Sequence, residues 1–146
     1  MLNAQNDQAA GLRRLFGATP QRVVGVVPCS AWVMPSLARQ IQARSRAARV
    51  LALDEESAGG RLADAFSVHS RFDLLQAVEG QARLGDCLVN AGPNFRLASV
   101  SQLARTFGCK RTLNQRILKL LGGFRPYFDE WFLLARAVDS TGVSRF

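Results

Sequence analysis

The chain has 146 residues, of which 48% are hydrophobic and 21% charged, and its formal net charge is +8 at pH 7. This length and balance are typical of one folded domain with its own core, and they exclude a disordered chain. No apolar run reaches the roughly 18 to 20 residues that cross a bilayer, and the first residues lack the apolar core of a signal peptide. We therefore expect a cytoplasmic protein without membrane contact.

The positive charge favours acidic surfaces or nucleic acid as partners through long-range attraction. The positive residues are scattered, however, and the densest group lies at the end of a helical pattern, at Arg44, Arg46 and Arg49. Cations there complement the negative end of the helix dipole. We interpret this group as a solvated helix end.

Three cysteines and one histidine give little support for a metal site. Cys29, Cys87 and Cys109 are odd in number and widely spaced, which argues against structural disulfides and against zinc. Because free cysteine is commonly buried, we interpret each of the three as a buried thiol. His69 has no carboxylate or cysteine partner nearby in the sequence, and we interpret it as a loop residue.

In chain order, residues 7–16 predict a short helix, and the apolar run at 22–27 predicts a strand. A helical pattern follows from Pro35, and residues 48–54 predict a second buried strand. This order is typical of a crossover between parallel strands, and both strands are expected to be central.

The remaining pattern completes an α/β fold with a mostly parallel sheet flanked by helices. The expected elements are a glycine-containing loop and short helix at 57–64, a helical turn at 72–80, two strands around a turn at 91–94, helices at 100–108 and 112–121, and a last strand at 130–135, for which a helix is the alternative.

The segment between the first strand and the following helix has the frame of a phosphate-binding loop without the groups that hold phosphate. Such a loop needs glycines, a lysine and a hydroxyl for magnesium, whereas here the sequence is PCSAWVMPS. The degenerate nucleotide loop is Pro28, Cys29, Ser30 and Ser36, with Asp54 at the end of the second strand. Asp54 occupies the place of an acid near a nucleotide, although an acid beside Glu55 and Glu56 also fits a solvated loop. We expect no cofactor and no enzymatic activity.

Two pieces of the chain resemble the MinD/ParA-like P-loop ATPase family, and within it the flagellar number regulators of the FlhG type. DQAAGLR at residues 7–13 looks like their N-terminal DQAxxLR activator motif. The order of segments at 22–57 and 72–100 is similar to the middle of MinD-like chains.

This resemblance implies a partner-binding helix. In the family, the motif helix docks on a signal-recognition-type GTPase, FlhF, and stimulates its GTP hydrolysis, with the glutamine close to the nucleotide. The residues that the likeness assigns to this contact are Asp7, Gln8, Ala9, Leu12 and Arg13. Alternatively, this helix packs on the protein's own sheet through Leu12, Leu15 and Phe16.

The expected organisation is an activator helix and linker at 1–20, a truncated MinD-like α/β domain at 21–138 and a flexible tail at 139–146. The chain departs from the family in its phosphate loop, and it stops before the second half of the domain and the amphipathic membrane helix. The expected function is non-enzymatic regulation of flagellar assembly. Because a half-length sheet leaves an exposed edge, a homodimer is also expected.

A DNA-binding function is the alternative. Residues 100–121 read as helix, tight turn, helix, in which Leu103, Phe107 and Ile117 form the core and Gly108 lies in the turn. The residues that would face the major groove are Lys110, Arg111, Asn114 and Gln115. Asn114 argues against it, because this position usually buries an aliphatic side chain, and an unpaired buried amide costs about 1 to 3 kcal/mol.

Overall fold

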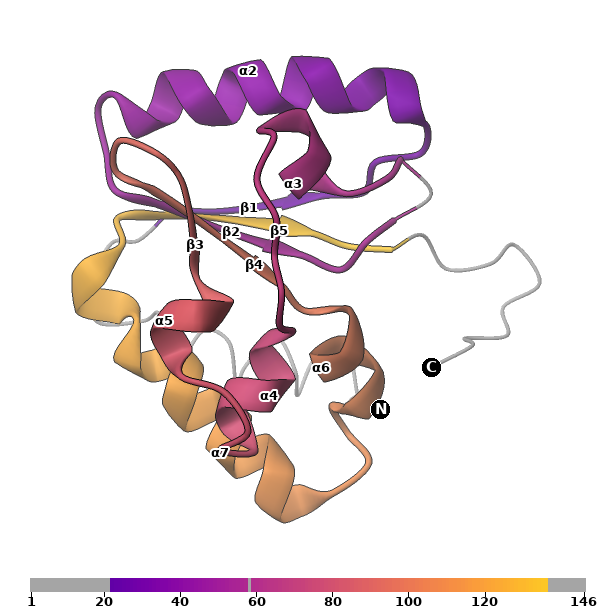
Figure 1. Ribbon diagram of the computed structural model, residues 1–146, viewed down its shortest axis with the longest axis vertical. Helices are drawn as coiled ribbons and strands as arrows, with labels where there is room; N and C mark the ends of the chain where they lie inside the picture. Colours follow the sequence, from indigo (N-terminus) through magenta and orange to yellow (C-terminus); the bar gives the residue numbers. More distant parts are fainter. Residues whose placement is uncertain (1–21, 58, 137–146) are drawn as a thin grey trace, which may run out of the picture.

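A five-stranded sheet forms the centre of the computed structural model, which describes residues 22–57 and 59–136 (Figure 1). The strands are β1 (Arg22–Val26), β2 (Val50–Asp54), β3 (Val89–Gly92), β4 (Phe95–Ser99) and β5 (Glu130–Leu134). Their order in the sheet is β1-β5-β2-β4-β3. All neighbouring pairs are parallel except β3 and β4, which form an antiparallel hairpin. The predicted α/β fold with a mostly parallel sheet is confirmed.

Helices cover both faces of this sheet, with α2 and α3 on one side and α4 to α7 on the other (Figure 1). Their bounds are α2 (Met34–Ser45), α3 (Leu62–Ala65), α4 (Leu74–Val78), α5 (Leu84–Cys87), α6 (Ser101–Thr106) and α7 (Arg111–Gly123), with short 3-10 turns η1 (Ala31–Val33) and η2 (Arg125–Tyr127). None of these described helices is long and apolar enough to cross a bilayer. The helix predicted at 7–16 lies outside the described residues.

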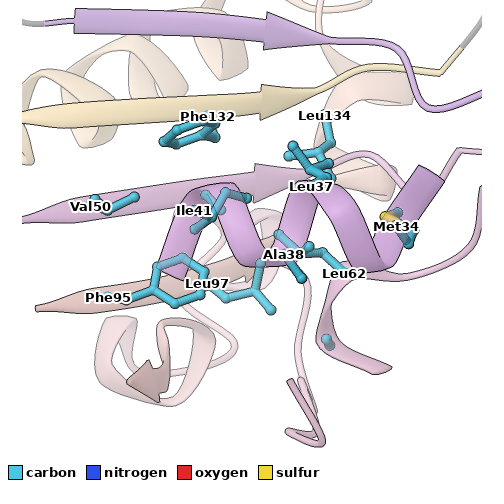
Figure 2. Close-up of a cluster of buried hydrophobic side chains, with 12 residues drawn as sticks. Met34, Leu37, Ala38, Ile41, Val50, Leu62, Phe95, Leu97, Phe132 and Leu134 are labelled. Carbon is cyan, nitrogen blue, oxygen red and sulfur yellow. The ribbon is translucent and has the colours of Figure 1, made fainter. Parts of the chain in front are cut away.

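The first core layer joins α2 to the sheet (Figure 2). The buried residues of α2 recur three and four positions apart, which places them on one face of the helix. Ile41 on this face is fully buried, and the Phe66 and Phe95 rings meet edge to face with centroids 4.9 Å apart. This layer fixes α2 across β5, β2 and β4.

The second core layer lies beneath α4 to α7. Trp131 of β5 is 1% exposed and packs near the rings of Phe124 and Phe128, with centroids 6.1 and 6.5 Å away. Ile117 is fully buried and joins α7 to the same cluster. The predicted strand at 130–135 is therefore a strand that contributes to both layers.

The predicted central position of the first strand is wrong. β1 pairs only with β5 in the described sheet, and its burial alternates between exposed and half-buried, with Val23 40% exposed. β5 lies between β1 and β2, so the two strands of the predicted crossover are parallel but not adjacent. A continuous apolar run does not reveal that a strand from the far end of the domain separates them.

Two predictions about side-chain environment are also wrong. Cys29 and Cys109 are exposed, because they lie in the loop after β1 and in the turn before α7, and only Cys87 is buried. Arg44 and Arg49 do not form a merely solvated helix end, because they pair with Glu130 and Asp129 at the start of β5. Such long-range partners are invisible in a local charge pattern.

Candidate functional site

The frame expected for a phosphate loop lies at the carboxyl end of β1, where ligands commonly bind in open α/β sheets. The loop at residues 27–30 leads through η1 into α2. Pro28 is buried, Cys29 is exposed, Ser30 is half-buried, and Ser36 is exposed in the first turn of α2. Asp54 ends the parallel strand β2 and so lies at the same edge of the sheet.

The chain itself covers this loop. A Cβ placed on Gly59 would lie 2.9 Å from Pro28 Cβ and 3.1 Å from the carbonyl oxygen of Ser30. Real Cβ atoms essentially never approach another atom within 3.0 Å, so a larger residue at position 59 would require Pro28 to shift. The Gly59 amide also donates to Ser57 Oγ, 3.2 Å away. The segment after β2 therefore packs directly on the loop.

Asp54 is engaged by this same segment. Its side chain is buried, and its two oxygens accept the backbone N–H groups of Glu56 at 2.9 Å and Leu62 at 2.7 Å. Burial raises the pKa of the Asp54 carboxyl above its ordinary value, and the two backbone donors partly oppose this shift. The interpretation as a solvated loop residue is wrong, because the carboxylate holds the loop that leads into α3.

The rim of the frame carries the acidic side chains of Glu55 and Glu56, which are both engaged by the chain itself. Glu56 has a positive φ of 60°, accepts a hydrogen bond from Ser99 Oγ at 3.1 Å and lies 3.4 Å from Arg61 Nε. Glu55 accepts the backbone N–H of Arg136 at 3.1 Å. Because carboxylates repel phosphate and Glu56 pairs with the Arg61 guanidinium, the rim is poorly suited to an anionic ligand.

The helix pair α6–α7 has the predicted arrangement around its turn. Leu103 and Ile117 are buried and Phe107 is half-buried in the second core layer, while Gly108 has a positive φ of 96°. Lys110, Arg111 and Gln115 are exposed. The expectation that the Asn114 amide would be buried without a partner is wrong. Asn114 is half-buried, and its side-chain oxygen accepts the N–H of Gly108 at 2.8 Å.

The remaining positions singled out in the sequence add no further binding or catalytic group to the described site. The activator residues at 7–13 lie outside the described residues. His69 is an exposed loop residue, as predicted. No cluster of three metal-binding side chains occurs within residues 22–57 and 59–136.

No family model matches the chain, and no curated protein matches it. Its fold is similar to cobyrinic acid a,c-diamide synthase from Mycobacterium smegmatis, with a TM-score of 0.57 and 14% identity over 80% of this chain and 50% of that one. McdA from Cyanothece gives 0.56 and 15% over 80% and 49%. A plasmid partition protein from Borrelia burgdorferi gives 0.53 and 12% over 80% and 56%.

The fold matches a truncated ParA/MinD-like P-loop fold. The chain spans about half the length of these solved structures. At such identities the similarity concerns the fold alone.

Two of the similar solved structures hold ATP or an ATP analogue. The synthase has been solved with an ATP analogue and magnesium, and McdA(D38A) as an ATP complex. In the present chain, residues 22–57 contain no lysine and the loop at 27–36 contains no glycine. Because Gly59 also packs on the loop and Asp54 binds the chain's own backbone, the described donors do not fit a nucleoside triphosphate.

Proposed function

We propose that the protein is a non-enzymatic regulator of flagellar assembly, in which a ParA/MinD-type fold carries an activator helix for an FlhF-type GTPase. The observation that carries this proposal is the altered phosphate-loop frame, where Gly59 packs on Pro28 and Ser30. The ATPase fold is kept while its nucleotide groups are missing, and DQAAGLR at residues 7–13 supplies a different activity.

The activator segment suits a helix that is completed on binding. An isolated helix of about ten residues is marginal in water, so its order comes from contact with a partner surface. Gln8 would lie close to the nucleotide of the GTPase, while Asp7, Ala9, Leu12 and Arg13 hold the helix on the partner.

The test is GTP hydrolysis by the FlhF-type GTPase of the same cell, measured with and without the full chain. We expect stimulation by the natural chain and loss of stimulation with Gln8→Ala. Gln5→Ala is the matched control, because Gln5 is the same residue type just outside the motif. Equal stimulation by the Gln8→Ala and natural chains would reject the proposal.

DNA binding is the second candidate, and the exposed Lys110, Arg111 and Gln115 at the start of α7 favour it. Asn114 contributes less than expected from the sequence, because its oxygen is bonded to Gly108. If duplex DNA is the ligand, affinity should fall steeply with added salt and drop in Lys110→Ala and Arg111→Ala. If the chain does not bind duplex DNA at low salt, this function is excluded.

A further inference from the structure

A cavity of about 840 Å³ lies on the α7 side of the sheet, away from the phosphate-loop frame. It is bordered by α4, α5, the second half of α7, η2 and the turn between β3 and β4. Arg49 and Asn94, which border it, precede β2 and β4, so the cavity lies at the amino ends of the parallel strands. Residues 27–30 lie at the opposite, carboxyl edge. The volume is in the range of roughly 300 to 1,000 Å³ that is usual for small-molecule sites.

The walls of this cavity are mainly apolar. Bulky apolar side chains come from α5, α7 and η2 or from the ends of these elements, and they include Leu84, Leu88, Leu120, Phe124 and Phe128. Such walls favour a ligand with a hydrocarbon body, because transfer of apolar surface out of water is favourable.

Positive side chains border the same cavity. Arg96 projects from β4, and Arg116 and Lys119 lie three positions apart on α7, which places them on one side of the helix. All three are exposed, and within the described part of the chain none of them forms an ion pair. No described residue that borders the cavity is acidic.

Arg49 differs from these three. It also borders the cavity, but its guanidinium donates to both carboxylate oxygens of Asp129 at 3.0 and 3.1 Å and to the carbonyl of Pro126 at 3.1 Å. Its charge is therefore committed to the start of β5. The uncommitted positive charge belongs to Arg96, Arg116 and Lys119.

We propose that this cavity binds a small amphiphilic anion, with a hydrocarbon chain against the leucine and phenylalanine walls and a carboxylate or phosphate head at Arg96, Arg116 and Lys119. Guanidinium groups match both head groups by paired hydrogen bonds. A small molecule fits better than a protein segment, because five elements bound the space and its volume is that of a ligand pocket. The site is separate from the phosphate-loop frame and goes beyond the proposed function.

The test is isothermal titration of the full chain with decanoate and with decyl phosphate, each below its micelle concentration. We expect saturable binding of one anion per chain, and the two compounds distinguish a fatty acid from a phosphate-headed lipid. Decyltrimethylammonium has the same tail and the opposite charge, and should not bind. Inorganic phosphate lacks the tail and should not bind either.

One variant and its matched control test whether the ligand occupies this cavity. Arg116→Glu should weaken binding of the preferred anion at least about tenfold, since a charge-assisted hydrogen bond is lost and a repulsion added. Arg39→Glu is the matched control, because Arg39 is an exposed residue of α2, on the other face of the sheet, and the change in net charge is identical.

Gly123 offers a way to fill the cavity without disturbing its walls. It borders the cavity at the end of α7, and a Cβ built there meets no atom within 4 Å. Gly123→Leu should abolish binding, whereas Gly123→Ala should retain it. Both residues favour a helix more than glycine does, so loss of binding cannot be ascribed to a weakened α7.

Several results would overturn the proposal. These are no binding of either anion, equal binding of decyltrimethylammonium, unchanged affinity in Arg116→Glu and Gly123→Leu, or equal weakening in Arg39→Glu. Binding only to vesicles of anionic lipid, with none to the monomeric amphiphiles, would indicate recognition of a membrane surface and would reject the cavity as a ligand site.

Discussion

A buried carboxylate at the start of β5 depends on one arginine. Glu130 is 5% exposed, and Arg44 near the end of α2 donates from Nε to Glu130 Oε2 at 3.0 Å and from a terminal nitrogen to Oε1. The hydrogen bond from Arg44 lowers the pKa of the Glu130 carboxyl, against the opposing effect of burial. This pair ties α2 to a strand 86 residues further along the chain.

Replacing this arginine should produce a pH-dependent loss of stability. A carboxylate with a depressed pKa contributes stability above its unfolded pKa and loses it as pH falls through the folded pKa. Arg44→Ala should therefore lower the free energy of unfolding at neutral pH, and the difference from the natural chain should shrink as Glu130 becomes protonated. Urea unfolding at a series of acidic to neutral pH values measures this.

Arg39→Ala is the control for that series, because Arg39 is exposed on the same helix and has no ion pair in the described residues. It should change stability little at any pH. If the Arg44→Ala deficit stays constant through the carboxyl range, the pair with Glu130 does not stabilise the fold as described.

The same residues show why the site could be predicted only in part. The missing lysine and glycines were evident in residues 27–36, because a phosphate loop is a local motif. The burial of Asp54 and the contact of Gly59 with Pro28 depend on packing between separate segments. The side chain of Asn114 likewise accepts a hydrogen bond from Gly108, six positions away, which the helical pattern of the sequence did not indicate.

At the scale of elements, Asp73 links the beginnings of two helices. Its side chain accepts the N–H of Leu75 at 3.0 Å in a capping box at the start of α4. It also accepts the backbone N–H groups of Gln102 at 2.9 Å and Leu103 at 3.2 Å in the first turn of α6. One carboxylate thus satisfies donors that two helices leave open at their N-termini.

Asp73→Ala should cost more than the loss of an ordinary helix cap. A single cap contributes about 1 kcal/mol, and here several buried donors lose their acceptor, so we expect a loss of about 2 to 4 kcal/mol. Asp73→Asn retains one acceptor oxygen and should cost less. Circular dichroism during urea unfolding measures both variants, and equal stability of Asp73→Ala and the natural chain contradicts this role.

The elements that could be predicted are those with long apolar periodicity or clear end signals. The i, i+3, i+4 spacing in α2 and α7 and the glycine after α4 gave three helices correctly. α5 contains four residues and η2 contains three, so neither repeats a pattern long enough to recognise. The hairpin of β3 and β4 was recognisable because Pro93 and Asn94 mark its turn.

At the scale of the whole molecule, the order of the strands is the feature that local patterns left open. β5 pairs with β1 on one side and with β2 on the other, although the paired residues Asp54 and Leu134 lie 80 positions apart in the chain. Parallel pairing of such distant segments is fixed by packing on both faces, chiefly through Trp131 and Phe132. Sequence reasoning identified the strands and their direction, and placed β1 wrongly.

The position of β1 at the edge predicts self-association. In parallel pairing, alternate residues direct their backbone groups to one side. Arg22 and Val26 bond to the β5 segment, so the backbone groups of Val23 and Gly25 point away from β5. Exposed edges of this kind template pairing with another chain, and charged side chains suppress it. Arg22 is exposed at the start of this strand, but beyond it Val23 is 40% exposed and Val27 is 49% exposed, so the edge from Val23 to Val27 is apolar.

We therefore expect the chain to form a homodimer through β1, with sedimentation coefficients that rise with concentration. Val23→Lys should shift the equilibrium toward monomer, because it places a charge on the pairing edge. Gln102→Lys introduces the same charge at an exposed residue of α6, which follows β4 and is separated from β1 by β5 and β2 in the sheet, and should leave the dimer intact. If the chain is monomeric at every concentration, another segment protects this edge. If Val23→Lys leaves the dimer unchanged, the dimer forms through another surface.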